Sequence, residues 1–182
     1  MKGGGKLKAR QLIFTALFAA LTAVAAFLRV PLGPVAVTPQ FLITAMAGVM
    51  LGAKWGAVSQ ALYVVLGLVG LPLFTMGGGL GYVLQPTFGF LLGLIAAAAV
   101  IGGITKGSAS PRRILLASLA GLAVLYIIGL PYMALILNGY LHQSIPLGKL
   151  LMVGCIPFLS FDGVKILLTA ALCPTLQKRL NR

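Results

Sequence analysis

Asp162 is the only acidic side chain in the 182-residue sequence, and Lys165 follows it three positions later. Both lie in the apolar stretch that runs from Ile156 to Leu168. On a helix, side chains three residues apart emerge from one face about a turn apart, so these two are expected to meet. Ionisable groups are expensive in hydrocarbon and by default mark a functional site. We therefore expect the pair to form the polar end of a pocket for a small molecule that carries a carboxylate.

The pair has two interpretations. In the functional one, the Lys165 ammonium attracts an anionic group of the ligand, while Asp162 keeps the lysine charged or accepts a hydrogen bond from the ligand. In the structural one, the two residues form an ion pair that locks a helix to itself. A pair on one helix joins no two helices, and a buried ion pair is weak evidence for stability. The functional interpretation is therefore favoured.

The composition indicates a membrane protein. Hydrophobic residues make up 60% of the chain and charged residues only 8%, whereas a soluble domain carries about 25% charged residues. Several apolar runs approach the roughly 20 residues that cross a bilayer. We expect an all-α membrane protein, with residues 1–182 forming a single integral membrane domain of six transmembrane helices in one bundle. The expected spans are about 12–28, 39–51, 55–69, 87–104, 114–137 and 157–176.

The basic residues indicate how the chain crosses the membrane. The net charge of +13 is not arranged as a basic stripe interleaved with aromatics, which argues against nucleic-acid binding. With six spans, eleven of the fourteen Lys and Arg residues lie on the side of the two termini, two lie on the other side, and Lys165 lies within the last span. Positive residues favour the cytoplasm, so both termini are expected there. The basic N-terminus resembles the start of a signal peptide, but the long apolar run after it favours a retained first span.

This orientation leaves three segments on the outer side: 29–38, 70–86 and 138–156. It also places the Asp162–Lys165 pair near the outer end of the last span. The segment 70–86 is rich in glycine, and includes Gly77-Gly78-Gly79-Leu80-Gly81. Glycine permits positive φ angles and close approach of a ligand or another chain segment. We interpret this segment as a loop that caps a pocket open to the outside, the alternative being an ordinary mobile connection.

Small residues four apart mark the first span. Ala16 and Ala20 form one such pair, and Ala19 and Ala23 form another. Small residues at this spacing permit close approach of two helices in a membrane. The alanine face serves either packing inside this protein or docking to a helix of a partner.

The sequence excludes most kinds of catalysis, so we expect no enzyme. A single acidic residue cannot supply paired carboxylates, and the single His142 lies in an expected outer loop. A metal cluster needs ligands that this chain lacks, so no metal is expected. Nor does the chain contain the GxxxxGK[ST] motif of P-loop ATPases, so any ATP coupling must come from another subunit. Cys155 and Cys173 are too far apart on a helix to form a disulfide and are expected to be packing residues.

Several stretches, in order along almost the whole chain, resemble the BioY family, the biotin-specific substrate-binding (S) components of energy-coupling factor (ECF) transporters. The matching stretches are Val37-Thr38-Pro39-Gln40, Tyr63-Val64-Val65-Leu66-Gly67-Leu68-Val69-Gly70-Leu71-Pro72-Leu73-Phe74, Gly77-Gly78-Gly79-Leu80-Gly81, Gln85-Pro86-Thr87-Phe88-Gly89-Phe90-Leu91-Leu92-Gly93 and Asp162-Gly163-Val164-Lys165. The sequence departs from the family at Gln85, where glycine is usual before Pro-Thr, and at Phe88-Gly89-Phe90, where Gly-Gly-Tyr is usual.

The resemblance implies a six-helix S component in the plasma membrane of a prokaryote. It would capture biotin with high affinity from the outside. Its partners would be a transmembrane coupling subunit and two ATPase subunits, so that ATP is used by the partners and the chain itself needs no cofactor. Lys165 would lie near the biotin carboxylate, and Ala16, Ala19, Ala20 and Ala23 would form the docking surface for the partner.

Further ligand contacts are expected from the chemistry of biotin. Its ureido ring needs donors and acceptors, and its thioether ring suits apolar and aromatic walls. Beyond Asp162 and Lys165, the candidate substrate-binding residues are the polar Gln40, Tyr82, Gln85 and Thr87, the aromatic Tyr63, Phe74 and Phe88, and Gly78 and Gly79.

Three alternatives remain open at this point. The chain can be an S component for another vitamin, which would share the fold but differ in its ligand contacts. It can be a stand-alone small-molecule channel or carrier, although no obvious internal repeat of the kind found in many carriers is present. It can also be a purely structural membrane subunit, which would leave the outward polar residues unexplained.

Overall fold

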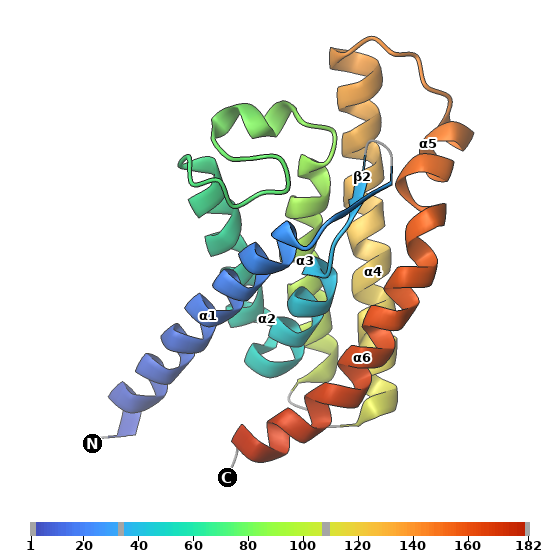
Figure 1. Cartoon of the computed structure of the whole chain (residues 1–182). Coiled ribbons are helices and arrows are strands. Elements are labelled where there is room, and N and C mark those ends of the chain that lie inside the picture. Colours follow the sequence, from blue (N-terminus) through green and yellow to red (C-terminus); the bar gives the residue numbers. More distant parts are fainter. Residues whose placement is uncertain (1–2, 33–34, 107–109, 181–182) are drawn as a thin grey trace.

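The apolar runs fold into long helices that stand side by side (Figure 1). The computed structural model describes residues 3–32, 35–106 and 110–180. The long helices are α1 (Gly3–Phe27), α2 (Gln40–Leu68), α3 (Phe88–Thr105), α4 (Pro111–Ala134) and α6 (Ile156–Leu180). Within the described residues, five helices are long and apolar enough to cross a membrane.

Helix α2 is bent back on itself into two arms. Gly52 breaks its helical backbone with φ 77° and ψ 178°, a conformation that glycine adopts most easily. The Thr44 hydroxyl donates to Gln60 Oε1 over 2.9 Å, sixteen residues along the chain. One turn nearer the bend, Gly56 lies so close to Gly48 that a Cβ atom on Gly56 would come within 3.0 Å of the Gly48 Cα. The two arms therefore run antiparallel, so the described residues form six long helical segments side by side.

The predicted all-α bundle of six helices is confirmed, with the arms of α2 lying where spans 39–51 and 55–69 were expected. The expected spans 87–104 and 114–137 compare with α3 and with α4 plus its continuation, a π-helical turn at Leu135–Tyr140.

The outer segments contain structure that hydropathy did not predict. Strands β1 (Val30–Leu32) and β2 (Val35–Val37) pair antiparallel in the first of them, so the chain is not entirely helical. The second contains the 3₁₀ helix η1 (Leu80–Leu84), and the third contains α5 (Leu147–Gly154). Each of these elements is too short to give a periodic hydropathy signal.

Small residues lie at the contact between α1 and α2. Helix α1 packs on α2 with Ala19, Ala23 and Ala26 buried, and between them the Thr22 hydroxyl donates to Gln60 Oε1 over 3.3 Å. Helix α3 contacts both α2 and α4, and α6 contacts α4 and α2. Small side chains let helix backbones approach closely, which is the main source of packing energy in a bilayer.

The two ends of the bundle differ in charge. The start of α1, the bend of α2 and the end of α6 lie together at the lower end in Figure 1, and η1 and α5 lie at the upper end. Several basic residues lie at this lower end, beside the bend of α2, at the end of α3, in the first turn of α4 and in the last turns of α6. They are Lys54, Lys106, Arg112, Arg113, Lys178 and Arg179. Lys2 and Arg182, which also count toward the predicted orientation, lie outside the described residues.

Candidate functional site

Asp162 is held by two donors from different helices. The Lys165 ammonium on the next turn of α6 donates to Asp162 Oδ1 over 2.6 Å. The Tyr126 hydroxyl of α4 donates to Asp162 Oδ2, also over 2.6 Å. Asp162 is 3% exposed, so this carboxylate depends on the two donors to compensate its burial.

The hydrogen bond from Tyr126 connects the charged pair on α6 to a second helix. The two residues do pair on one helix as expected, but the conclusion that they join no two helices was wrong, because Asp162 also accepts a bond from Tyr126 of α4. A structural contribution of Asp162 is therefore real. It does not exclude a ligand-binding one, since all three side chains line the same cavity.

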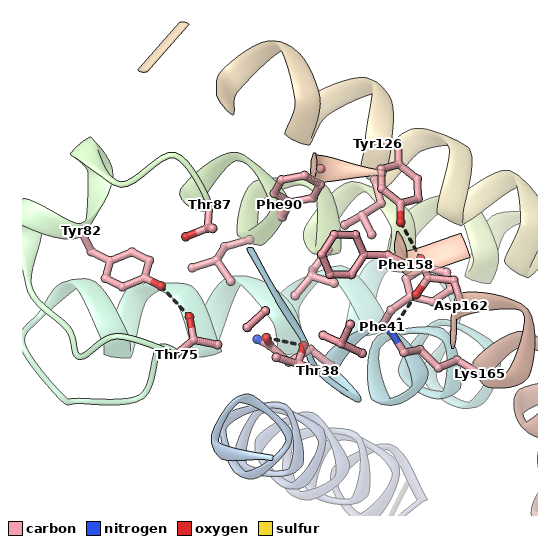
Figure 2. Close-up of a pocket in the computed structure, with 17 residues that line it drawn as sticks. Thr38, Phe41, Thr75, Tyr82, Thr87, Phe90, Tyr126, Phe158, Asp162 and Lys165 are labelled. Carbon is pink, nitrogen blue, oxygen red and sulfur yellow. Dashed lines mark hydrogen bonds and ion pairs between the residues drawn. The ribbon is translucent and has the colours of Figure 1, made fainter. Parts of the chain in front are cut away.

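This cavity lies between the helices and the first two outer segments, with the charged pair at one end (Figure 2). Its mostly apolar lining with a few polar groups is typical of a site for a small organic ligand. Its lining residues are Ala36, Val37, Thr38, Gln40, Phe41, Thr75, Tyr82, Thr87, Phe90, Leu91, Leu94, Leu125, Tyr126, Gly154, Phe158, Asp162 and Lys165.

The chemistry of the cavity changes along its length. Figure 2 shows Phe41, Phe90 and Phe158 around its middle, beside the Tyr126–Asp162–Lys165 group. The opposite end carries neutral polar groups, including the Thr75 hydroxyl, which lies 2.9 Å from the Tyr82 hydroxyl. A ligand with one anionic end, an apolar middle and a neutral polar end would match this sequence of surroundings.

Five of the predicted contact residues line the cavity: Asp162, Lys165, Gln40, Tyr82 and Thr87. The Gln40 amide is already engaged on both sides, because its Oε1 accepts from the Thr38 hydroxyl over 2.9 Å and its Nε2 donates to the Tyr63 hydroxyl over 3.0 Å. By contrast, the buried Thr87 Oγ1 has no hydrogen-bond partner within the described residues. The Thr87 hydroxyl is thus an unpaired polar group of a residue that lines the cavity.

The other six predicted contacts do not line the cavity: Tyr63, Phe74, Gly78, Gly79, Gln85 and Phe88. Two aromatic residues of this set, Tyr63 and Phe74, lie behind the residues that line the cavity. Tyr63 is fully buried and its hydroxyl joins Gln40 to the Leu73 carbonyl. The Phe74 ring packs edge-on against the Tyr63 ring, with 5.5 Å between the ring centroids. It is tilted against the Tyr82 ring, with 4.5 Å between the centroids. These rings support lining residues from the side away from the cavity.

The glycines of the outer loop are explained by chain packing. A Cβ atom on Gly78 would lie 2.1 Å from the Leu71 carbonyl oxygen, and one on Gly67 would lie 2.2 Å from the Phe74 ring. Gly79 has a positive φ of 97°, and its N–H donates to the Gly67 carbonyl over 2.7 Å. The loop is thereby folded tightly onto the end of α2.

The loop is also tied to the segment before α2. The Arg29 guanidinium donates to the Thr75 carbonyl. Since Thr75 lines the cavity, as do Ala36 and Val37 of β2, both outer segments contribute to its mouth.

Sequence analysis missed most of the apolar and aromatic lining, including Phe41, Phe90, Tyr126 and Phe158, together with Thr38 and Thr75. An aromatic residue within an apolar span looks the same whether it faces a cavity, a helix or lipid, so no local signal could have found Phe41, Tyr126 or Phe158, whereas Phe90 lay in a stretch that carries the family resemblance. Thr38 did lie in a stretch that carries the family resemblance, but its contact with Gln40 is visible only in the structure.

The predicted docking face on α1 is divided. Ala19 and Ala23 are 4% and 8% exposed, because they pack within the chain. Ala16 and Ala20, on a neighbouring face, are exposed. Within the described residues, no three His, Cys, Asp or Glu side chains are grouped closely enough to hold a metal ion.

Comparisons with known proteins agree with this geometry. The model of the BioY family matches residues 1–182. A probable biotin transporter BioY of Lysinibacillus sphaericus is 40% identical over 169 residues, which cover 92% of this chain and 86% of that protein. The biotin transporter BioY of Thermotoga maritima is 37% identical over 170 residues, covering 93% and 96% of the two chains. The crystal structure of the S-component for biotin from an ECF-type ABC transporter matches with a TM-score of 0.83 at 27% identity, covering 98% of this chain and 95% of that one.

Proposed function

Because the chain belongs to the BioY family, we propose that it is the biotin-binding subunit of a vitamin uptake transporter. One observation carries the proposal: the cavity has a charged pair at one end, aromatic rings in its middle and neutral polar groups beyond them, among which the Thr87 hydroxyl has no partner in the described part of the chain. These surroundings complement the carboxylate, the apolar portion and the ureido ring of biotin.

The proposed binding mode assigns the carboxylate to Lys165. The ammonium has three N–H groups and only one of them is bonded to Asp162, so it can donate to a ligand as well. Asp162 already accepts a short bond on each oxygen, which favours its role as the support of Lys165 over a direct ligand contact. Phe41, Phe90 and Phe158 would contact the apolar part of biotin, and Thr87 its ureido ring.

The proposed orientation puts the cavity on the outer side of the membrane. Basic residues gather at the end of the bundle that holds the start of α1 and the end of α6. Positive residues favour the cytoplasm. Both termini are then cytoplasmic, and biotin enters from the side of η1 and α5.

Transport would require partners. The sequence contains no P-loop, so we assign ATP hydrolysis to two partner ATPases and the connection between them and this chain to a transmembrane coupling subunit. The exposed Ala16 and Ala20 of α1 offer a small-residue face for a helix of that subunit. Ala19 and Ala23 support the docking helix from inside, since they pack α1 onto the rest of the chain.

Direct binding tests the proposal. The purified chain in detergent is expected to bind biotin in equilibrium titrations, and cells that express it are expected to take up labelled biotin when a coupling subunit and ATPases are also present. Absence of biotin binding would exclude the proposed function. Binding of a different vitamin in its place would indicate an S component of other specificity, and uptake in cells that lack every coupling ATPase would indicate a stand-alone carrier.

Thr87 gives a prediction that separates a ligand contact from a structural one. The substitution Thr87→Val keeps the shape of the side chain and removes a hydroxyl that has no partner in the described part of the chain. We expect the affinity for biotin to fall about 2- to 10-fold, as for the loss of one hydrogen bond. The thermal stability of the ligand-free protein should stay the same or rise, because a buried unpaired hydroxyl is costly. Titration and thermal denaturation measure the two effects.

The matched control is Thr105→Val, at the opposite end of α3. The Thr105 hydroxyl is buried but donates to the Ile101 carbonyl of its own helix over 2.9 Å. Its loss should leave the affinity for biotin unchanged. Equal affinities of the Thr87→Val variant and the unmodified chain would exclude Thr87 as a ligand contact.

A further inference from the structure

Tyr126 lies where α4, α3 and α6 meet at the charged end of the cavity (Figure 2). Its ring packs edge-on against Phe90 of α3, with 6.1 Å between the ring centroids and 88° between the planes. Its hydroxyl points to Asp162 Oδ2 over 2.6 Å. One end of this side chain is therefore fixed by packing, while the other donates a short bond to the only acidic side chain of the sequence.

The three polar groups form a chain in a fixed order: Tyr126, Asp162, Lys165. The hydroxyl and the ammonium approach different oxygens of the one carboxylate, each at 2.6 Å. Two donors on different helices fix both the position and the plane of that carboxylate. Because Lys165 is held by Asp162, the position of its ammonium is set relative to α4 as well as to its own helix.

An anionic ligand disturbs this balance. A ligand carboxylate that binds Lys165 competes with Asp162 for the same ammonium, and two negative groups then share one positive group in surroundings that are mostly apolar. A buried carboxylate that loses its cation is strongly destabilised. A hydroxyl that donates to a carboxylate forms a short, charge-assisted bond, stronger than one between neutral groups. Tyr126 is the second donor to Asp162, and it keeps this carboxylate paired while Lys165 is shared with the ligand.

We propose that Tyr126 is a positioning residue for anionic ligands, which acts through Asp162 to keep Lys165 in place and available to a carboxylate. The inference rests on the proposed function, because it requires a carboxylate-bearing ligand at Lys165. Tyr126 need not touch the ligand carboxylate. It makes binding at Lys165 possible at a lower cost in free energy.

The test compares Tyr126→Phe with the unmodified chain and uses two ligands: biotin, and the neutral amide of biotin. The substitution removes the hydroxyl and keeps the ring that packs on Phe90. We expect the affinity for biotin to fall about 10- to 100-fold, the range of a hydrogen bond to a charged group. The affinity for biotin amide should change less than about threefold, as for a substitution remote from the contacts. This split between the two ligands is the result that a purely structural role would not give.

Tyr132→Phe is the matched control. Tyr132 lies on the same helix and its hydroxyl donates to the Val83 carbonyl, outside the cavity lining. Any effect of its loss should be the same for the two ligands. The inference would be overturned if Tyr126→Phe lowered the affinity for biotin and for biotin amide equally. It would also be overturned if the variant bound both ligands as tightly as the unmodified chain. In either case the proposed function would stand. Failure of the unmodified chain to bind biotin would remove the function and the inference together.

A second measurement tests the route through Asp162. In an Asp162→Ala background the hydroxyl of Tyr126 has no carboxylate to hold, so adding Tyr126→Phe should lower the affinity for biotin little further. Residues that act through one another show such non-additive effects. A full additional loss in that background would show that Tyr126 acts by a contact of its own, and the positioning role would be wrong.

Discussion

Replacing Lys165 with alanine is expected to lower the affinity for biotin by about 30- to 4000-fold, the largest effect of any single side chain in the cavity. Truncating one partner of a buried, hydrogen-bonded charge pair costs roughly 2–5 kcal/mol. The side chain of Lys165 is only 13% exposed, so water would replace its contacts poorly. The substitution also leaves Asp162 with Tyr126 as its remaining donor in the described part of the chain. Equilibrium titration with labelled biotin measures the loss.

Lys149→Ala is the control for the loss of charge alone. Lys149 lies on α5 but is exposed and does not line the cavity. Its removal lowers the net charge by the same amount and should leave the affinity unchanged. If Lys165→Ala binds biotin as tightly as the unmodified chain, the Asp162–Lys165 pair has only a structural role.

Gly102→Ala is expected to have the largest effect on stability. Gly102 of α3 packs directly against the bend of α2, where a Cβ atom would lie 2.3 Å from the backbone nitrogen of Ala53 and 2.4 Å from the carbonyl carbon of Gly52. Backbone atoms cannot rotate away as a flexible side chain can, so α3 and α2 must separate. Overpacking of this kind costs roughly 1–3 kcal/mol, and more where the backbone resists. A lower thermal midpoint in detergent, followed by size-exclusion chromatography, reports the loss.

The neighbouring glycine supplies the comparison. A Cβ atom on Gly103 would have no heavy atom within 4 Å. Gly103→Ala should therefore leave the stability unchanged or raise it by about 0.5–1 kcal/mol, since alanine is the better helix former. Equal thermal midpoints for the two variants would contradict the close contact between α3 and the bend.

Hydropathy predicted the helices because they must bury their backbone in a bilayer, and this demand leaves a signal in every span. The expected spans 39–51 and 55–69 left a break between them, and the Gly52 bend of α2 lies in that break. The predicted break did not reveal the antiparallel contact of Gly48 with Gly56, which depends on the position of each glycine in three dimensions. The pairing of β1 with β2 was missed because strands of three residues carry almost no pattern.

Only site residues of a chemical type that is rare in this sequence could be predicted. Asp162 and Lys165 were conspicuous because acidic side chains are otherwise absent and charges are few. Tyr126 and Phe158 were hidden among many aromatic and apolar residues. Gly78 and Gly79 were predicted as ligand contacts, but their lack of side chains is explained by the fold of the loop itself. Family resemblance indicated which segments matter without distinguishing the wall of the cavity from its support.

The bend of α2 has a consequence for how the protein enters the membrane during synthesis. The arm from Gln40 to Leu51 has twelve residues, about 18 Å of helix at 1.5 Å per residue, against roughly 30 Å of hydrocarbon. Its Gln40 and Thr44 find their partners on the second arm, at Tyr63 and Gln60. Alone in lipid this arm would be too short and would expose unpaired polar groups. We therefore expect the two arms to enter the membrane together, as a closed helical hairpin.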